Sequence, residues 1–413
     1  MEFSEPPTYR PLSRTNFPPR THNRGRKSRV KIVHIANFYG PKSGGIRTTL
    51  HELGAGYIAK GHEFTYIVPG TGLFCEETPD GRKITVPSFE LPFSGGYRII
   101  RNNSQIKRLL ITLMPDVLEI SDRFTLSGVG KWAGQRKIKT AVFSHETLVG
   151  LAAHYFPFPL TPLIDWHNRR LAKRFDIVIA TTAFAAREFE KLEITNLVRV
   201  PLGVNLETFS PFKRDEALRS VLLKGGQTLL VHCGRLSREK YPARSIETLE
   251  ILLQRGVNAR LIYVGIGPLF KKLRERSKEL PVTFLGYIAD RDKVSQILAS
   301  ADVSLAPGPI ETFCLAALES LASGTPVVAS NTSAVGEYLL LDAVEPVGAI
   351  ANNNPKSFAD AIESVIEMRK NNRGLASACQ HQAENFPWSS TISLMLALHG
   401  DSFQRSTRRL RVA

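Results

Sequence analysis

The chain has 413 residues, of which 43% are hydrophobic, and its formal net charge is +16. This length and apolar content suffice for two or three domains with their own cores, and no apolar run approaches the roughly 18 residues that a membrane-spanning helix needs. The four cysteines (Cys75, Cys233, Cys314 and Cys379) are too scattered for a metal site or a disulfide framework, and no secretory signal is evident, so we expect a cytoplasmic protein.

About half of the charge excess lies in two basic tails. Residues 1–30 hold seven Arg and Lys against two Glu, and residues 401–413 hold four Arg against one Asp. The first tail, 1–29, is rich in Pro, Arg and Ser, which is typical of disordered segments. It is either a solvated tail or a segment attracted to an anionic surface. Membrane lipid is then favoured over nucleic acid, because the chain has no nucleic-acid motif.

A first α/β lobe is predicted over residues 30–205. An apolar strand at 31–36 ends in a Gly-rich loop at 40–45, a helix follows, and a strand at 64–68 completes a strand–helix–strand unit. Apolar positions of that helix are Leu50, Leu53, Tyr57 and Ile58. Further apolar runs predict strands at 117–120, 140–144, 177–180 and 197–200.

A second lobe is predicted over residues 206–387, after a linker-like segment that runs from 201 to 212. Strands are expected at 228–233, 260–264, 282–285, 303–306 and 326–329, alternating with helical segments. Ligands of doubly wound sheets bind outside the carboxyl ends of the strands. Two doubly wound, Rossmann-like lobes facing across a cleft are therefore the expected α/β architecture.

Two carboxylates, Glu311 and Glu319, lie eight residues apart in a segment that predicts a helix. At about 100° per residue they would be roughly 80° apart around the axis and about 12 Å apart along it. They could then face one cleft without sharing a proton. Glu311 would also lie near the helix N-terminus, where free amides receive an anion.

Four segments carry a family resemblance. Residues 234–240, 265–269, 284–287 and the Glu311…Glu319 element resemble, in order and spacing, the donor-site loops of glycosyltransferase family 4, whose members are retaining enzymes of the GT-B fold. The similarity extends over roughly residues 31–395. It implies that segment 385–388 returns a last helix, about 388–402, to the first lobe, which leaves 403–413 as the second basic tail.

The resemblance implies roles for four catalytic residues. Arg235 and Lys240 would stabilise the departing diphosphate, as a forked and a point cation. Glu311 would hold donor-sugar hydroxyls, and His145 would reach the sugar near the transferred carbon. No acidic metal cluster is evident in the sequence, so the two cations would replace a divalent ion, and neither metal nor cofactor is expected.

Further residues would bind the nucleotide-sugar donor. Glu319 would grip the ribose, Tyr287 would lie by the base, and the Gly-rich loops would let backbone approach phosphate. The full implied set is Gly44, Gly45, Gly234, Gly267, Tyr287, Ile310, Phe313, Cys314, Leu315 and Glu319. Relatives commonly have Gly where Cys314 stands. A redox or nucleophilic role for this thiol stays open, as does a role for Arg123 toward an acceptor phosphate. The alternative for the Gly-rich loop at 40–45 is a plain turn, and the alternative for His145 is a structural role.

The donor and acceptor are suggested by three segments, 36–45, 91–98 and 306–313. They resemble actinobacterial mannosyltransferases that extend phosphatidylinositol mannosides with GDP-mannose. This implies α-(1→6) transfer to the dimannoside by front-side attack. The alternatives are another UDP- or GDP-linked donor with another lipid or soluble acceptor, a nucleotide-sugar epimerase, or a non-catalytic binding protein. The sequence does not reveal the base or the oligomeric state.

A lipid acceptor implies peripheral association with the anionic inner face of the plasma membrane. Two stretches mix aromatic and basic side chains, 91–108 and 151–174. Aromatic rings insert at the interface, and each cation contributes about 1 kcal/mol near anionic lipid. The alternative is that both are ordinary amphipathic helices packed on the sheet.

Overall fold

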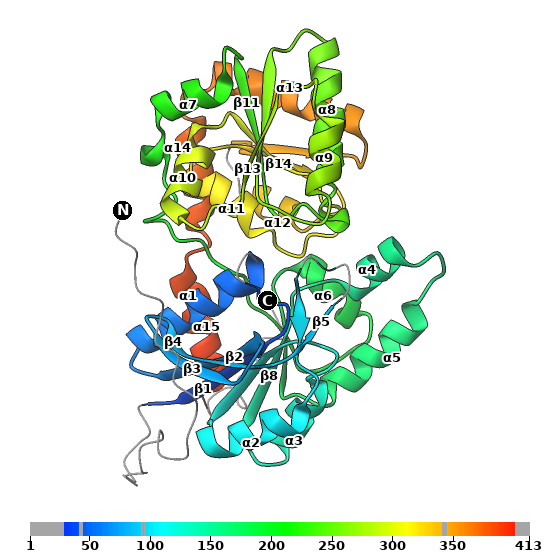
Figure 1. The fold of residues 1–413 in the computed structure, drawn as a ribbon, viewed down its shortest axis with the longest axis vertical. Coiled ribbons are helices and arrows are strands. Elements are labelled where there is room, and N and C mark those ends of the chain that lie inside the picture. The colour runs from blue at the N-terminus through cyan, green and yellow to red at the C-terminus, as the bar shows by residue number, and fades with distance from the viewer. Residues whose placement is uncertain (1–28, 41–43, 92–93, 95, 341–344, 401–413) are drawn as a thin grey trace.

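The computed structural model describes residues 29–40, 44–91, 94, 96–340 and 345–400. These residues form two α/β lobes, each built on its own twisted sheet (Figure 1). Most of the first basic tail and all of the second lie outside the described residues, so the choice between a solvated tail and one attracted to an anionic surface stays open.

The first sheet has eight strands in the order β10-β9-β8-β7-β1-β2-β4-β3, parallel except for β3, which runs antiparallel to β4. The strands are β1 (Lys31–Ala36), β2 (Glu63–Gly70), β3 (Phe74–Thr78), β4 (Gly81–Pro87), β7 (Val117–Ser121), β8 (Lys139–Ser144), β9 (Ile177–Ala180) and β10 (Leu197–Arg199). A two-stranded antiparallel ribbon, β5 (Phe89–Glu90) with β6 (Arg98–Ile99), follows β4 in the chain and precedes helix α2 (Asn103–Leu113).

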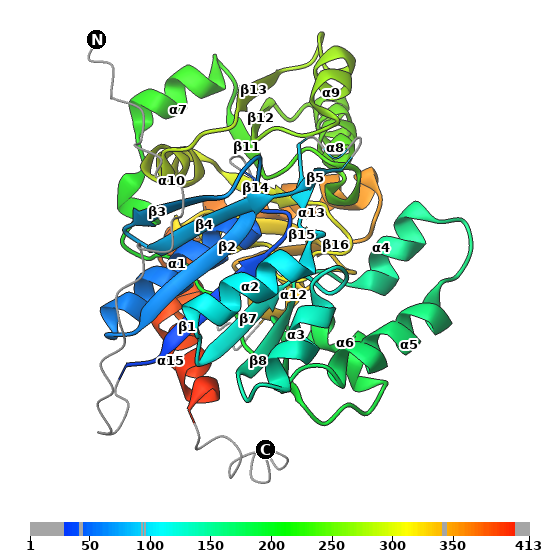
Figure 2. The same cartoon turned by 60° about the horizontal axis from the view of Figure 1, so that its bottom comes forward.

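Helices cover this sheet on both faces (Figure 2). They are α1 (Gly45–Ala59), α2 (Asn103–Leu113), α3 (Ser127–Gly134), α4 (Leu148–Tyr155), α5 (Thr161–Ala172) and α6 (Ala183–Glu190). Helix α1 buries Leu50, Leu53 and Tyr57 against the strands, as the sequence predicted. The fourth predicted apolar position, Ile58, is instead exposed. The α4–α5 hairpin projects from the side of the lobe in both views.

The second sheet has six strands in the order β13-β12-β11-β14-β15-β16, and all five pairings are parallel. The strands are β11 (Thr228–Cys233), β12 (Ala259–Val264), β13 (Val282–Gly286), β14 (Val303–Ala306), β15 (Val327–Ser330) and β16 (Gly348–Ala351). The helices are α7 (Glu216–Leu223), α8 (Pro242–Gln254), α9 (Phe270–Arg276), α10 (Arg291–Ser300), α11 (Leu315–Ala322), α12 (Val335–Leu339), α13 (Pro355–Asn371) and α14 (Leu375–Glu384), with short 3-10 turns at 211–213 and 238–240.

The strand order reverses between β1 and β7 in the first sheet and between β11 and β14 in the second. Such reversals open a crevice at the carboxyl ends of the strands, where doubly wound folds bind ligands. The loops that follow β1, β7, β11 and β14 are therefore the ones placed to form a site.

The last helix, α15 (Trp388–His399), crosses back and packs on α1 of the first lobe. The crossing point is close: a Cβ on Gly203 would lie 2.5 Å from the Trp388 nitrogen, so this position requires glycine. Val204 pairs with Pro387 in an isolated parallel bridge. The two segments that connect the lobes, near residues 203–204 and 387–388, thus lie side by side and contact each other.

Every strand predicted from the sequence is present, with ends shifted by at most two residues. Strands β3, β4, β5, β6 and β16 were not predicted. The edge strand β3 and its neighbour β4 carry charged and intermediate positions rather than a buried apolar run. Strand β16, with the sequence Gly-Ala-Ile-Ala, is too short and small to give a pattern.

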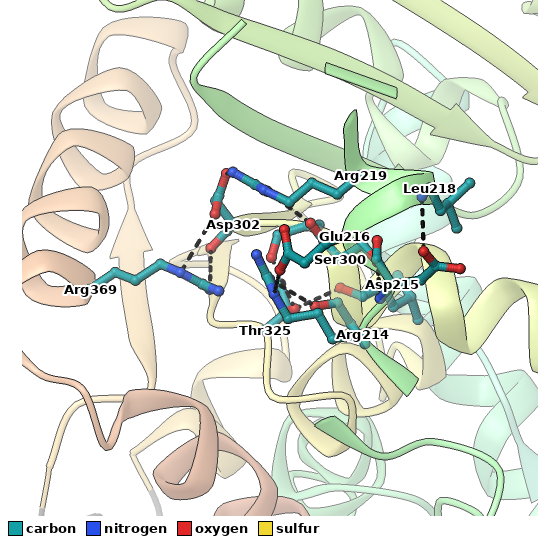
Figure 3. A network of polar contacts seen from close by, with 12 residues as sticks. Arg214, Asp215, Glu216, Leu218, Arg219, Ser300, Asp302, Thr325 and Arg369 are labelled. Atoms are coloured by element: carbon teal, nitrogen blue, oxygen red, sulfur yellow. Dashed lines mark hydrogen bonds and ion pairs between the residues drawn. The ribbon is translucent and has the colours of Figure 1, made fainter. Parts of the chain in front are cut away.

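A buried ionic network fastens the second lobe (Figure 3). Asp302 accepts from Arg219 at 2.8 Å and from the backbone amide of Leu229 at 2.7 Å. Arg369 of α13 approaches the same carboxylate at 3.5 Å. Because the Asp302 side chain is 12% exposed, these contacts supply the partners that a desolvated charge requires. The network ties α7 and α13 to the strands β11 and β14.

Candidate functional site

Lys240 and Glu311 form the centre of the candidate site. Lys240 follows β11 in the 238–240 turn, Glu311 follows β14, and the ammonium lies 2.6 Å from each carboxylate oxygen. Burial alone would lower the pKa of Lys240, but Glu311 more than offsets this and the pKa lies above its usual value. Lys240 is therefore a permanent cation at the reversal point of the sheet.

The expectation that Glu311 and Glu319 share one helix is wrong. Helix α11 begins at Leu315, so only Glu319 is helical and Glu311 belongs to the loop before it. The cause is local, because Cys314 has φ 64° and ψ 73°, a left-handed conformation that cannot continue a right-handed helix. The helical spacing derived from the sequence does not apply.

Cys314 stands at a position where the backbone favours glycine. A positive φ is costly for residues that carry a Cβ, which explains physically why relatives would have Gly there. Burial raises the pKa of the Cys314 thiol, with Glu311 acting in the same direction. The thiolate, which is the reactive form of cysteine, is thus disfavoured, and the redox or nucleophilic role left open by the sequence is not supported.

The first amides of α11 face this loop without intrahelical acceptors, as at any helix N-terminus. One of them is the amide of Leu315, which the sequence analysis placed in the set that binds the nucleotide-sugar donor. The Phe313 side chain, 3% exposed, instead packs against Tyr338 and Phe386. Only the backbone of Phe313 is therefore available to a ligand.

The loops after β11 and β12 need their glycines for different reasons. Gly234 has φ 154°, and a Cβ there would meet nothing within 4 Å, so the backbone is open to a ligand. A Cβ on Gly267 would lie 2.4 Å from the Leu236 oxygen. Gly267 is thus required for packing these two loops together, and it supports the loop after β11 instead of lining open space.

Arg235 extends toward the first lobe. Its guanidinium lies 4.1 Å from the Tyr97 ring centroid and donates to the carbonyl of Ser94. The loop between β5 and β6 therefore holds Arg235 across the cleft. The remaining guanidinium N–H groups are the ones available for a phosphate.

A cation that the sequence analysis did not foresee lies beside Glu319. Glu319, 8% exposed, pairs with Arg291 of α10 through Oε1, and the Arg291 guanidinium lies 4.8 Å from the Phe209 ring centroid. Oε2 of Glu319 has no partner among the described residues and is the oxygen that a ribose could use. The predicted base neighbour, Tyr287, accepts from Arg47 of α1 at 3.3 Å.

Gly44 and Gly45 begin α1 opposite these loops. A Cβ at either position would meet nothing within 4 Å, and Gly44 supplies no side-chain cap. The first amides of α1 are therefore unshielded, which is the arrangement that receives an anionic group.

His145 is brought to the Glu311 loop from the other lobe. Its carbonyl accepts from the hydroxyl of Thr312, and Thr181 and Thr182 donate to the Thr312 carbonyl at 3.1 and 2.8 Å. Burial lowers the pKa of His145 to about 3, with nearby His34 and Arg123 acting in the same direction. The imidazole is therefore neutral at physiological pH. Beside it, Ile310 packs against Gly150 of α4.

Arg123 does not face an acceptor, contrary to the possibility left open by the sequence. Its side chain is 2% exposed and pairs with Glu188 at 2.5 Å. It also donates to the carbonyl of Glu146. Arg123 instead holds the His145–Glu146 loop from the interior of the lobe.

The sequence analysis missed several polar residues inside the first lobe. His34 and Glu119 are both 0% exposed and lie 2.7 Å apart, on adjacent strands that are otherwise apolar. A His and a Glu within apolar strands is a signal in itself, because buried polar groups need partners. Arg291, in contrast, begins an ordinary charged helix and gives no such signal.

The described residues show neither a metal cluster nor a membrane-spanning helix. Among the described residues, no group of three or more His, Cys, Asp or Glu is placed to hold a metal ion. Within the same part of the chain, no helix is both long and apolar enough to cross a bilayer.

Family profiles match both lobes. The profile "Glycosyltransferase Family 4" matches residues 43–208, and "Glycosyl transferases group 1" matches residues 213–383. The structure of sucrose-phosphate synthase from Thermosynechococcus elongatus superposes with a TM-score of 0.73 at 19% identity, over 91% of this chain and 100% of that one. An Anabaena protein, Alr3699/HepE, superposes at 0.69 with 18% identity, over 89% and 98%. The expected GT-B fold is confirmed.

Curated relatives extend over most of the chain. A Mycobacterium tuberculosis protein named GDP-mannose-dependent alpha-(1-6)-phosphatidylinositol dimannoside mannosyltransferase is 44% identical over 90% of this chain and 96% of its own length. A GDP-mannose-dependent alpha-mannosyltransferase of Corynebacterium glutamicum is 28% identical over 72% of each chain. With the site geometry and these matches together, the chain belongs to the family 4 glycosyltransferases with the GT-B fold.

Proposed function

We propose that this protein transfers mannose from GDP-mannose to a phosphatidylinositol dimannoside, forming an α-(1→6) linkage with retention of anomeric configuration. The observation that carries the proposal is the 44% identity over 90% of the chain to a relative named for that reaction. The Lys240–Glu311 pair is the geometric support, since it places a cation and a hydroxyl-binding carboxylate at one point of the cleft.

The chemistry would be front-side displacement. The acceptor hydroxyl would attack the face from which GDP departs, and the leaving diphosphate would take the acceptor's proton. Lys240 and Arg235 would stabilise the charge that accumulates on the diphosphate, as would the amides that begin α11. Glu311 would orient the sugar, so that the protein's contribution is positioning and charge stabilisation.

The test is a donor and acceptor matrix with the purified protein. GDP-mannose, GDP-glucose, UDP-glucose and UDP-galactose are each incubated with and without the dimannoside. Nucleotide release is measured, and product linkage is determined. Acceptor-dependent GDP release with an α-(1→6) product supports the proposal. Transfer from a UDP-sugar in preference would replace it by the alternative of another family 4 reaction.

The same proposal includes peripheral contact with an anionic membrane through the α4–α5 hairpin. Its exposed apolar side chains are Tyr155, Phe156, Phe158, Leu163 and Trp166. Arg169, Arg170 and Lys173 are exposed on the same hairpin, whereas its acidic residue Asp165 is paired with Lys191 at 2.6 Å. Aromatic rings beside exposed cations suit an anionic lipid surface.

The hairpin also borders the cleft. Tyr155 donates to Glu239 at 2.8 Å, one residue from Lys240. A lipid held on α4–α5 would thus present its head group beside the diphosphate loop. The other candidate stretch, 91–108, does not support membrane contact: Ile100 is buried, Tyr97 lies against Arg235, and Phe93 is outside the described residues.

Vesicle sedimentation tests this surface. Phe156→Ser/Phe158→Ser should weaken binding to vesicles containing anionic phosphatidylinositol by about tenfold or more, because burying one such ring contributes roughly 1.5–3 kcal/mol. Phe212→Ser is the matched control, since Phe212 is 93% exposed on the other lobe. Equal vesicle binding by the double variant and the wild type would show that the hairpin is not the membrane contact.

A further inference from the structure

A chain of short hydrogen bonds runs from the interior of the first lobe to His145. Glu119 contacts His34 Nδ1 at 2.7 Å, and His34 Nε2 contacts the Ser121 hydroxyl at 2.7 Å. The same hydroxyl contacts His145 Nε2 at 2.7 Å. His34 and Glu119 are 0% exposed and Ser121 is 3% exposed, so water does not compete with these bonds.

Glu119 is held as a carboxylate at the inner end of the chain. Burial would raise its pKa, but hydrogen bonds from His34 and His399 more than offset this and lower the pKa to about 2. Tyr57 donates to it as well, at 2.8 Å. An ionised carboxylate only accepts, so His34 must present a proton on Nδ1.

The single hydroxyl proton of Ser121 links the protonation of His34 Nε2 to that of His145 Nε2. The hydroxyl contacts two imidazole nitrogens, and no other acceptor for it exists among the described residues. It can donate to one nitrogen and must accept from the other. If His34 Nε2 is bare, Ser121 donates to it and His145 Nε2 must carry a proton. If His34 Nε2 is protonated, the order reverses and His145 Nε2 must be bare.

The outer nitrogen of His145 is free to act on a ligand. Among the described residues, His145 Nδ1 has no hydrogen-bond partner, and it is not one of the fully buried unpaired atoms. The ring is held parallel to Phe143, at 5.5 Å between centroids and 5° between planes. Its position is therefore fixed, and what varies is whether Nδ1 donates or accepts.

We propose that Glu119, His34 and Ser121 form a relay that locks His145 in one tautomer and so determines whether its Nδ1 donates to or accepts from a hydroxyl of the donor sugar. The three residues position His145 and do not touch the substrate. This inference rests on the proposed function for the identity of the ligand, whereas the tautomer lock itself does not.

The first test is read on the wild-type protein and uses variants only to assign the spectra. Long-range ¹H–¹⁵N correlation spectra of ¹⁵N-histidine-labelled protein report the protonation of each ring nitrogen, and His34→Gln and His145→Gln supply the assignments. The relay predicts complementary Nε2 atoms in the wild type, one protonated and one bare. Both protonated, both bare, or averaged shifts at His145 would overturn the proposal.

The second test breaks the chain at Ser121. Ser121→Ala should leave His145 with averaged nitrogen shifts, and Ser121→Thr, which keeps the hydroxyl, should restore one tautomer. Ser245→Ala is the matched control, because Ser245 makes a buried 2.9 Å bond to His232 in the other lobe. The control should leave the His145 shifts unchanged.

Calorimetry then separates this proposal from the proposed function. Ser121→Ala should weaken GDP-mannose about 2- to 12-fold, the loss expected for one neutral hydrogen bond, and leave GDP unchanged. Equal weakening of both ligands would point to general damage and contradict a role at the sugar. If the wild type does not bind GDP-mannose, the proposed function fails, and the spectra still decide on the lock.

Discussion

Lys240→Met gives the sharpest test of the candidate site. The substitution keeps much of the side chain's length and apolar stem but removes the ammonium that lies 2.6 Å from both oxygens of Glu311. Two separate losses are expected: charge stabilisation of the leaving diphosphate in catalysis, and the partner of Glu311 in the folded state.

The magnitudes follow from the surroundings. Removing one preorganised donor from a developing anion costs about 2.7–4 kcal/mol, so kcat should fall about 10²- to 10³-fold. The Glu311 side chain is 9% exposed, whereas that of Lys240 is 36% exposed. Leaving a buried carboxylate without its partner costs roughly 1–3 kcal/mol, and solvent near Lys240 places the loss at the lower end.

The assays are steady-state GDP release and urea unfolding, each on the single and paired variants. Lys213→Met is the matched control, since Lys213 pairs with Asp292 at 2.8 Å on an exposed surface. The double variant Lys240→Met/Glu311→Gln should regain part of the lost stability, because it removes the unpaired charge, but none of the lost kcat. A kcat within threefold of wild type in a folded Lys240→Met protein would refute the assignment of Lys240 to the diphosphate.

Four further predictions concern stability, pH and metal. Cys314→Val should destabilise by about 1–3 kcal/mol, because a β-branched residue fits poorly at φ 64°, whereas Cys314→Gly should change stability by about 1 kcal/mol or less, both measured by urea unfolding. Asp302→Ala should cost about 3–5 kcal/mol by removing the carboxylate shared by two arginines, and an unchanged urea midpoint would contradict the network's importance. Burial lowers the pKa of His145 and His232 to about 3, so the unfolded chain binds protons that the folded chain does not. The free energy of unfolding should then fall from about pH 6.5 toward pH 3, by at most about 1.4 kcal/mol per pH unit for each histidine, and a glutamine variant of either should flatten the slope in urea titrations. EDTA should leave GDP release unchanged, and loss of activity that Mg²⁺ restores would contradict cation-only stabilisation.

The placement of a charged or polar site residue was predictable where that residue directly follows an apolar strand. Arg235 and Lys240 follow the buried run of β11, and His145 follows that of β8. Parallel strands bring their carboxyl ends to one edge, so a strand that can be recognised from sequence places the residues that follow it. The pairing of Lys240 with Glu311 needed more, since it joins loops that are 71 residues apart.

Local backbone geometry was not predictable. The segment around Cys314 has the composition of a helix, and only the left-handed φ of that residue separates Glu311 from α11. Similarly, nothing in the pattern around Arg123 distinguishes a ligand-binding cation from one buried against Glu188. In both cases long-range packing overrides the local preference.

The sequence by itself determined the alternation of strands and helices and the division of the strands between two lobes. It also placed cations and carboxylates at the ends of those strands. These features are predictable because hydrophobic period and strand-end position are local properties. The tertiary structure decided which of those groups meet. It assigned Arg291 to Glu319, Arg123 to the interior and Ser121 to both His34 and His145. Such partners lie on separate elements, and their charges and protons take definite positions only when packing excludes the water that would otherwise solvate them.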